Sequence, residues 1–575
     1  MASPASPPRF WIPPLWNRET HWESNIMAGI QFLADLYQGS WNGELFQSPP
    51  PPVDENKVSE ILVNYRGMLD QFPASDVEAL GRIPDELLSL MARDGFFGLS
   101  IPAAYGGLGL NTQEYLRVVE GLAKMDLSVA LVSLAHLSIG VKGLVLFGND
   151  EQKAAYLPHA ASGSSIFAYA LTEPQTGSDA QHITTRAELS DDGRTYVLNG
   201  QKTYITNANY AGAMTVFAQL DPAKPGFMGA FIVETGWDGV KIGKDMPKMG
   251  LKASSTAAVQ FRDVRVPMEN LLGKPGDGFK IAMTILNYGR LGLGAASVGL
   301  MEQSLHDMLK RAANRVQFGT PISHFPLIQE KIVKARVYSV VSAAMNAFAA
   351  KILDQYPLAD LAVETSHCKL FGTTRAWDTL NDALQVAGGS GYLATQPYEK
   401  RLRDFRVATV FEGTTEIHSI YPPLFMVRRI SRQLGDGSLG ILARLGRVTG
   451  GLYKGIDCPV RFEHRVLRKA ARFARRHAGA IKRRLYAGLV VYGKKISRKE
   501  FFLRRITTLS LYTYGTLALL ARYNQQRQGD PDPIGLLALR YFMEEGRQAD
   551  KDGRHLFQTK LDGLKHRLFH HMTTD

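Results

Sequence analysis

The residue best suited to do chemistry in this sequence is Glu412, which is followed by Gly413 and Thr414 in the run FEGTTE (411–416). A glutamate shielded from water has a raised pKa, so it can accept a proton efficiently near neutral pH. Gly413 would let the backbone approach a ligand closely, and the Thr414 hydroxyl could donate a hydrogen bond to it. The alternative is a solvated or salt-bridged carboxylate in a surface turn. Other motifs must therefore decide between these two interpretations.

Four further motifs lie in order along the chain. They are YALTEPQTGSDA (169–180), NGQKTYITN (199–207), RVQFG (315–319) and QVAGGSGY (385–392). Each one alone fits an ordinary strand end, hairpin or loop. Arginine in the third motif suits bidentate contacts to phosphate oxygens, and glycines in the fourth permit close backbone approach. Neither of these two matches GxGxxG, so a nicotinamide cofactor is not implied.

Taken together, the five motifs resemble the acyl-CoA dehydrogenase family. The segments GFKIAMTILNYGR (278–290) and RVQFGTPISHFPLIQEK (315–331), with the long C-terminus, are most similar to its very-long-chain branch. The resemblance implies FAD-dependent α,β-dehydrogenation of long-chain or very-long-chain fatty acyl-CoA to trans-2-enoyl-CoA, the first step of fatty acid β-oxidation. It also implies Glu412 as the base and an electron-transferring flavoprotein as the electron acceptor. The alternatives are an acyl-CoA oxidase, or a DNA-associated relative that binds through a basic C-terminal region.

The resemblance also assigns the binding residues, with each FAD shared between two subunits of a homodimer. FAD would contact Tyr169, Leu171, Thr172, Gly177, Ser178, Tyr204, Thr206, Arg315, Phe318, Gln385, Gly388, Gly389, Thr414 and Glu416. Acyl-CoA would contact Ser178, Asn287, Arg290 and Gly413. No metal is expected.

Two positions depart from the family pattern. Tyr204 stands where the family usually has tryptophan, so the ring that shields the flavin is smaller but still aromatic. Gly289 stands where some relatives carry their catalytic glutamate, immediately before Arg290. Glycine cannot act as a base, which strengthens the assignment to Glu412.

The chain should contain several domains, because single cores stop growing near about 250–300 residues. The changes in its hydrophobic pattern predict an α+β protein. Apolar residues recur at helical spacing in 58–165, short β-branched and aromatic runs fill 166–277, and long helical patterns return in 278–434. By resemblance these are a helical domain, a β domain and a four-helix bundle. Residues 435–575 predict an extra basic helical domain, and the Pro-rich residues 1–57 predict an arm or spacer.

One local detail is also predicted. Asn199-Gly200 is the preferred two-residue signal for a type I′ hairpin turn, here between 195–198 and 202–206.

Composition and targeting signals limit the setting. Cys368 and Cys458 lie far apart without metal-ligand spacing, so neither a disulfide framework nor a zinc site is indicated. The uncharged run 506–521 is too short and too polar to span a membrane, and residues 1–16 lack a signal or transit pattern. We expect a non-secreted protein on the cytoplasmic side of a bacterial inner membrane or, as an alternative, on the matrix face of a mitochondrial membrane.

The basic charge is concentrated in one segment. Residues 440–530 hold 21 Lys/Arg and four Asp/Glu, whereas the whole chain has a net charge of +13. Within it, 466–485 has an apolar residue every three or four positions and basic residues between them, which predicts a basic amphipathic helix. A helix docked on the domain below is one interpretation. We expect peripheral membrane contact through 439–485, and no nucleic acid, because the apolar, glycine-broken 439–455 could enter a headgroup layer.

Overall fold

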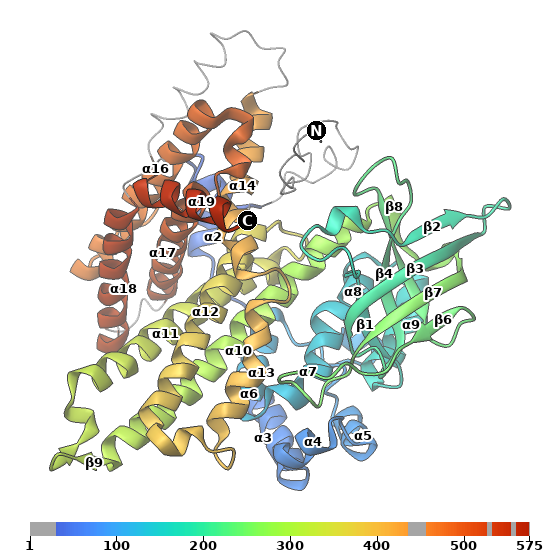
Figure 1. The fold of residues 1–575 in the computed structure, drawn as a ribbon, viewed down its shortest axis with the longest axis horizontal. Coiled ribbons are helices and arrows are strands. Elements are labelled where there is room, and N and C mark those ends of the chain that lie inside the picture. Colours follow the sequence, from blue (N-terminus) through green and yellow to red (C-terminus); the bar gives the residue numbers. More distant parts are fainter. Residues whose placement is uncertain (1–29, 435–455, 526–531, 554–558, 574–575) are drawn as a thin grey trace.

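The computed structural model describes residues 30–434, 456–525, 532–553 and 559–573. A helical domain is followed by a β domain and then by a long helical bundle, with further helices on the side of the bundle away from the sheet (Figure 1). Strand β1 (Ile166–Ala170) and helix α10 (Gly278–Asn314) begin where the sequence texture changes. The predicted α+β class with an additional C-terminal helical part is confirmed.

The N-terminal helical domain is built from α3 to α9. Their bounds are α3 Glu55–Gln71, α4 Ala74–Leu80, α5 Asp85–Arg93, α6 Thr112–Met125, α7 Leu127–Ala135, α8 Lys142–Phe147 and α9 Asp150–Ser162. Capping boxes begin α6 and α9, which satisfies backbone N–H groups in their first turns. Among the described residues, the stretch Leu127–Phe147 could cross a membrane by length and composition alone. Its most apolar window is 78% buried, as in the core helix of a folded domain.

The β domain is an eight-stranded sheet in the order β6-β7-β3-β2-β4-β5-β8, with β1 parallel to β4. The other strands are β2 Arg186–Leu189, β3 Thr195–Thr206, β4 Ala211–Gln219, β5 Met228–Glu234, β6 Val240–Ile242, β7 Thr256–Pro267 and β8 Leu271–Gly276. Strand β4 is buried along almost its whole length. Helix α10 packs against β4, β5 and β8, which joins this domain to the bundle.

The predicted hairpin at Asn199-Gly200 is wrong. Strand β3 runs through both residues and pairs with β7 on either side, with a register shift between Leu198 and Gly200. Asn199 accepts a hydrogen bond from the Asp263 N–H (2.9 Å) and donates to its carboxylate (3.0 Å). The local turn signal is overridden because pairing with a strand about sixty residues away continues across it, and the register shift is an extra residue in β7.

The helical bundle after the β domain contains the four long helices expected. They are α10, α11 (Pro326–Gln355), α12 (Ala362–Ala387) and α14 (Thr415–Leu434), with the shorter α13 (Pro397–Arg406) before the last. The small ribbon of β9 (Val316–Gln317) and β10 (Thr320–Pro321) connects α10 to α11 at the end of the bundle farthest from the sheet (Figure 1).

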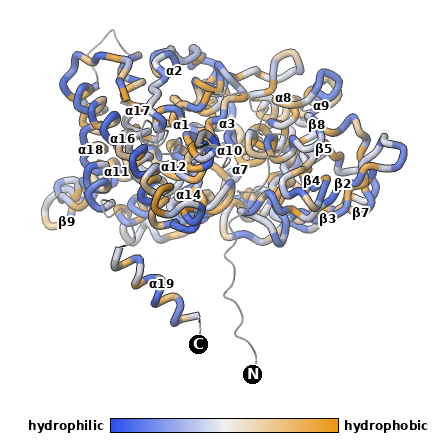
Figure 2. The backbone as a smooth tube through the Cα atoms, turned by 90° about the horizontal axis from the view of Figure 1, so that it is seen from above, coloured by the Kyte–Doolittle hydropathy of each residue, from blue (hydrophilic) through white to orange (hydrophobic). Residues whose placement is uncertain are grey.

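Four more helices follow: α16 (Arg465–Tyr492), α17 (Glu500–Gln525), α18 (Pro533–Asp552) and α19 (Lys560–Thr573). Helix α17 packs against α11, α12 and α14, so the extension continues the bundle rather than forming a separate body. Helix α19 stands away from the rest of the protein (Figure 2). The Arg505–Asp562 ion pair (2.5 Å) holds its beginning.

The amphipathic helix predicted in 466–485 exists as part of α16, but its apolar stripe is buried. Phe473, Ile481 and Leu485 are core residues, and α16 packs against α17, α18 and α14. Helix α16 is therefore docked on neighbouring helices through this stripe, with its basic face exposed. The exposed basic residues are Arg468, Lys469, Arg472, Arg475, Arg476 and Arg483, whereas Lys482 is buried. The segment 439–455 lies outside the described residues.

The spacer predicted for 1–57 is also wrong for its described half. Helices α1 (Phe32–Leu36) and α2 (Gly43–Gln47) are core elements, with α1 against α12 and α2 against α17. The Leu33 N–H donates to the buried Glu364 carboxylate (2.6 Å). The Tyr37 hydroxyl lies 2.6 Å from Ser510 Oγ. The short apolar clusters form helices because their partners lie hundreds of residues away, which local composition does not reveal.

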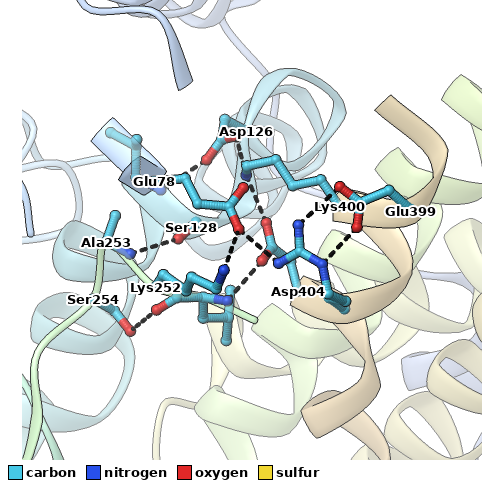
Figure 3. Close-up of polar contacts among 12 residues, drawn as sticks. Glu78, Asp126, Ser128, Lys252, Ala253, Ser254, Glu399, Lys400 and Asp404 are labelled. Atoms are coloured by element: carbon cyan, nitrogen blue, oxygen red, sulfur yellow. Dashed lines mark hydrogen bonds and ion pairs between the residues drawn. The ribbon is translucent and has the colours of Figure 1, made fainter. Parts of the chain in front are cut away.

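A polar cluster joins the N-terminal helices, the β domain and α13 (Figure 3). Lys400 Nζ contacts Asp126 (2.6 Å) and Asp404 (2.7 Å). Arg403 pairs with Glu78 (2.6 Å) and Glu399 (2.6 Å). A cavity of about 320 Å³ adjoins these residues. Because the charged groups are paired with one another, we interpret the cluster as a structural contact that holds these domains together.

Candidate active site

Glu412 lies in a tight turn between the 3-10 turn Val407–Thr409 and α14. Its φ is +54°, in the left-handed region that side chains other than glycine rarely adopt, and φ of Gly413 is +93°. A methyl group added at Gly413 would lie 2.7 Å from His418 Nε2. Glycine is therefore required at 413 both by the backbone and by the neighbouring ring.

The Glu412 carboxylate points toward the middle of α10. A Cβ atom at Gly289 would overlap both carboxylate oxygens of Glu412 and would come within 2.6 Å of Cδ. The absence of a side chain at Gly289, noted in the sequence as a departure, is what makes room for this carboxylate.

Buried polar atoms gather around the carboxylate without protein partners. In the described part of the chain, Glu412 Oε2 and Arg290 Nε make no hydrogen bond. Burial raises the pKa of Glu412 to about 7, although the charges of Arg290 and Lys369 act in the opposite direction. The group can therefore exchange a proton near neutral pH, as the first interpretation of FEGTTE required.

Residues from three domains face this carboxylate. Arg290 donates to Asn287 Oδ1 (3.2 Å), which also accepts from the Thr365 hydroxyl (3.0 Å). Tyr115 on α6 and Tyr169 on β1 have pKa values raised first by burial and then by the charge of Glu412. The site therefore lies where the bundle, the N-terminal helices and the sheet meet.

Three functional candidates at this turn were missed in the sequence: Ser366, Lys369 and His418. Lys369 Nζ donates to the Gly413 carbonyl (2.6 Å), and His418 Nε2 lies 3.0 Å from the Glu412 carbonyl oxygen. Ser366 Oγ lies 2.7 Å from His418 Nδ1. A lysine inside the otherwise uncharged run HCKLFG (367–372) was the available signal for one of them.

The ends of β1 and β3 carry the residues predicted to meet the flavin ring. The Thr203 N–H donates to the Thr172 carbonyl (2.9 Å), which places Thr172 beside Tyr204 and Thr206. The Tyr204 side chain is 68% exposed, with φ of +58° at a second register shift of β3. Leu171 is buried, while Gly177 and Ser178 lie in an exposed loop.

A buried ion pair also missed in the sequence supports these strand ends. Lys202 Nζ lies 2.8 Å from Glu173 Oε1, both side chains being at most 1% exposed. Lys202 also donates to the Leu171 carbonyl (3.1 Å). The other Glu173 oxygen accepts from the backbone N–H (2.6 Å) and hydroxyl (2.7 Å) of Thr184. This network fixes the chain between Leu171 and Thr185.

The remaining predicted FAD residues lie elsewhere. Arg315 and Phe318 are at the β9–β10 turn, and Gln385, Gly388 and Gly389 are at the end of α12. Arg311 donates to the Ala387 carbonyl (3.1 Å), so these two groups share one end of the bundle. That end is far from the sheet (Figure 1), and Phe318 is 95% exposed. One chain therefore does not bring these residues to Tyr204 and Thr206.

Comparison with known proteins agrees with the motifs. Residues 68–164, 168–264 and 276–420 match the family models for the acyl-CoA dehydrogenase N-terminal, middle and C-terminal domains. The human very long-chain specific mitochondrial acyl-CoA dehydrogenase is 37% identical over 522 residues, covering 86% of this chain and 79% of the relative. The chain belongs to the acyl-CoA dehydrogenase family. The resemblance stated from the five motifs is confirmed, and with it the class of enzyme, an oxidoreductase.

Solved acyl-CoA dehydrogenases share the architecture. A Bacillus anthracis acyl-CoA dehydrogenase complexed with FAD is similar with a TM-score of 0.76 and 27% identity, covering 91% of this chain and 94% of that one. Butyryl-CoA dehydrogenase from Megasphaera elsdenii covers 66% of this chain with a TM-score of 0.61 and 32% identity.

The helices beyond α14 therefore have counterparts in some acyl-CoA dehydrogenases and not in others. Within the described residues, no group of three His, Cys, Asp or Glu side chains is arranged to hold a metal.

Proposed function

We propose that this protein catalyses the FAD-dependent α,β-dehydrogenation of long-chain or very-long-chain fatty acyl-CoA, as in the first step of β-oxidation. The observation that carries the proposal is the Glu412 carboxylate, which has a buried, unpartnered oxygen and a pKa raised to about 7. A buried carboxylate with a pKa near 7 can remove the weakly acidic α-proton of a thioester.

The residues around Glu412 divide the work. Glu412 takes the α-proton, and Gly289 gives its carboxylate room against α10. Among the described residues, none accepts a hydrogen bond from the backbone N–H of Glu412, so this donor is free for the thioester oxygen. Such a donor would stabilise the negative charge that develops there, most strongly where water is excluded. Asn287 and Arg290 would bind and orient the acyl-CoA.

The residues present fit FAD. Tyr204 exposes an aromatic side chain next to Thr172 and Thr206, at the ends of β1 and β3. When bound, FAD would supply the acceptor for the hydride from Cβ. Thr414 and Glu416, at the start of α14, would also contact it.

We propose a homodimer because the residues suited to the adenine and pyrophosphate half of FAD lie at the opposite end of the bundle. Arg315, Phe318 and Gln385 of one copy would complete the site of the other. The second copy would then cover side chains that are exposed at this end of a single chain, such as Phe318 (95% exposed) and Tyr392 (81% exposed).

The function is tested by adding acyl-CoA of increasing chain length to the purified protein without oxygen. We expect long-chain acyl-CoA to bleach the flavin absorbance. Analytical ultracentrifugation of the same protein should show a dimer. Failure of every chain length would refute the dehydrogenation, and a monomer retaining FAD would refute the shared site. In air, stoichiometric peroxide would instead favour an acyl-CoA oxidase, whereas we expect transfer to an electron-transferring flavoprotein.

Long-chain preference rests on small side chains along α7. Ser128 and Ala130 are small and buried, although the Ser128 hydroxyl accepts a hydrogen bond from the Ala253 N–H (3.2 Å). Leu134 lies further along the same helix, and its carbonyl accepts from the Tyr115 hydroxyl (3.5 Å). The chain-length series above measures this preference directly.

We also propose peripheral contact with the cytoplasmic side of an anionic membrane, without nucleic-acid binding. The support is the exposed basic face of α16 and the exposed apolar residues of α19, among them Leu564, Leu568 and Met572. Because the apolar stripe of α16 is core, attraction to the surface would be electrostatic at this helix.

Exchanging Arg468, Arg472 and Arg476 for glutamine is expected to weaken sedimentation with anionic liposomes, while neutral liposomes bind neither protein. The exchange leaves the buried stripe intact, so the thermal midpoint serves as the folding control. Binding to duplex DNA without binding to liposomes would reverse the choice of partner.

A further inference from the structure

We propose that Lys369 and His418 are positioning residues, which hold the Glu412 turn by the carbonyl oxygens of Gly413 and Glu412. The inference deepens the proposed function and rests on it for its kinetic consequence. Both contacts are made to consecutive peptide groups of the turn that carries the base.

The turn needs external support because its backbone is strained. Glu412 has φ of +54°, and a residue other than glycine adopts this region only at a cost in free energy. Two hydrogen bonds from buried side chains compensate for this cost and fix both peptide planes. With the two carbonyls directed at Lys369 and His418, the Glu412 N–H is left unpaired within the described structure and the carboxylate faces Gly289.

The protonation of His418 follows from its partners. A carbonyl oxygen can only accept, so Nε2 must carry the proton that is shared with Glu412 O. Burial lowers the pKa of His418 well below its usual value, so the ring is neutral and Nδ1 is an acceptor. The Ser366 hydroxyl then donates to Nδ1 (2.7 Å) and selects this tautomer.

Lys369 differs from His418 because it also brings a charge. Burial lowers the pKa of Lys369 to about 8, so it is mostly protonated at pH 7. The other titratable groups around the carboxylate are Arg290 on α10, Tyr115 on α6, Tyr169 on β1 and Glu416 on α14. Among these, Arg290 and Lys369 are the cations whose charges lower the pKa of Glu412.

The two residues therefore predict different defects. Lys369→Met removes a hydrogen bond and a charge, so flavin reduction by acyl-CoA should slow about 10–100-fold. The pH midpoint of that rate should rise by about one pH unit. His418→Leu should slow reduction by a similar factor with the midpoint unchanged. His418→Gln, which keeps an N–H donor, should recover most of the rate.

A second readout does not depend on turnover. The carbonyl stretching band of protonated Glu412 can be assigned by infrared spectroscopy from its loss in Glu412→Gln, and then titrated. We expect its midpoint to rise in Lys369→Met and to stay in place in His418→Leu. The matched control is Thr373→Val, one turn from Lys369 on α12, which removes a hydroxyl bonded only to the Lys369 carbonyl of its own helix (2.8 Å).

The inference is overturned if both variants reduce flavin at the wild-type rate, or if Thr373→Val loses as much rate as they do. An infrared midpoint unmoved by Lys369→Met would also overturn the role of the lysine charge. If the wild-type protein reduces no flavin at all, the proposed function fails. A shifted infrared midpoint would then still establish that Lys369 acts on Glu412.

Discussion

Replacing Glu412 by glutamine is expected to slow flavin reduction by at least about 10³-fold, because an amide cannot accept the α-proton. The substitution keeps the shape of the side chain, so FAD and acyl-CoA should still bind. The rate of the wild-type protein should rise with pH through about 7, since the carboxylate is the active form and burial raises its pKa to that value. Stopped-flow measurements of flavin bleaching across pH give both results.

Glu416 supplies the control for this substitution. It lies four residues away at the start of α14 and is exposed. Glu416→Gln should weaken the retention of FAD while leaving the reduction rate per bound flavin near that of the wild type. Turnover of Glu412→Gln at a normal rate would move the base to another residue.

Lys202→Met is expected to destabilise the β domain by about 3–5 kcal/mol, because it leaves the Glu173 carboxylate buried without its counter-charge. Burial alone would raise the pKa of Glu173, but Lys202 and the hydrogen bonds from Thr184 and Thr185 lower it to about 2. This pair therefore stabilises the fold above the ordinary pKa of glutamate, and the contribution is lost as the pH falls toward 2. Thermal unfolding followed by FAD fluorescence measures the loss.

Two variants make this result interpretable. Lys224→Met removes the lysine of an exposed pair with Asp221 (2.8 Å), where we expect no measurable change. Lys202→Met combined with Glu173→Gln removes both charges and should recover part of the loss. Wild-type stability in Lys202→Met would show that Glu173 is compensated by other groups.

Part of the candidate site could be predicted from short motifs. Glu412 and Arg290 stand at positions that the family resemblance marks, and Gly289 could be recognised as a departure from that pattern. Lys369 and His418 could not be recognised in the sequence, because each is an ordinary helix residue whose role depends on its contact with the turn. A hydrogen bond to a backbone carbonyl requires no particular residue spacing, so it leaves little trace in the sequence.

Errors in the fold have the same origin. The Asn199-Gly200 signal is local, whereas the course of β3 is decided by its pairing with β7. The clusters in α1 and α2 are too short to indicate helices alone, since short helices depend on tertiary packing. The domain changes near residues 166 and 278 were visible because they alter the hydrophobic period over many residues.

The contact of α1 and α17 with α12 has a consequence for synthesis. Leu33 contacts Glu364, and His367 lies 2.7 Å from Ser510 Oγ, so one side of α12 is complete only after residue 510 has been made. Synthesis proceeds at about 5–20 residues per second, so this side of α12 stays incomplete for on the order of 10 s after α12 itself has been made. During that time some of its apolar and ionisable groups lack their final partners. The N-terminal segment, made first, can cover part of that surface while the last helices are still to come.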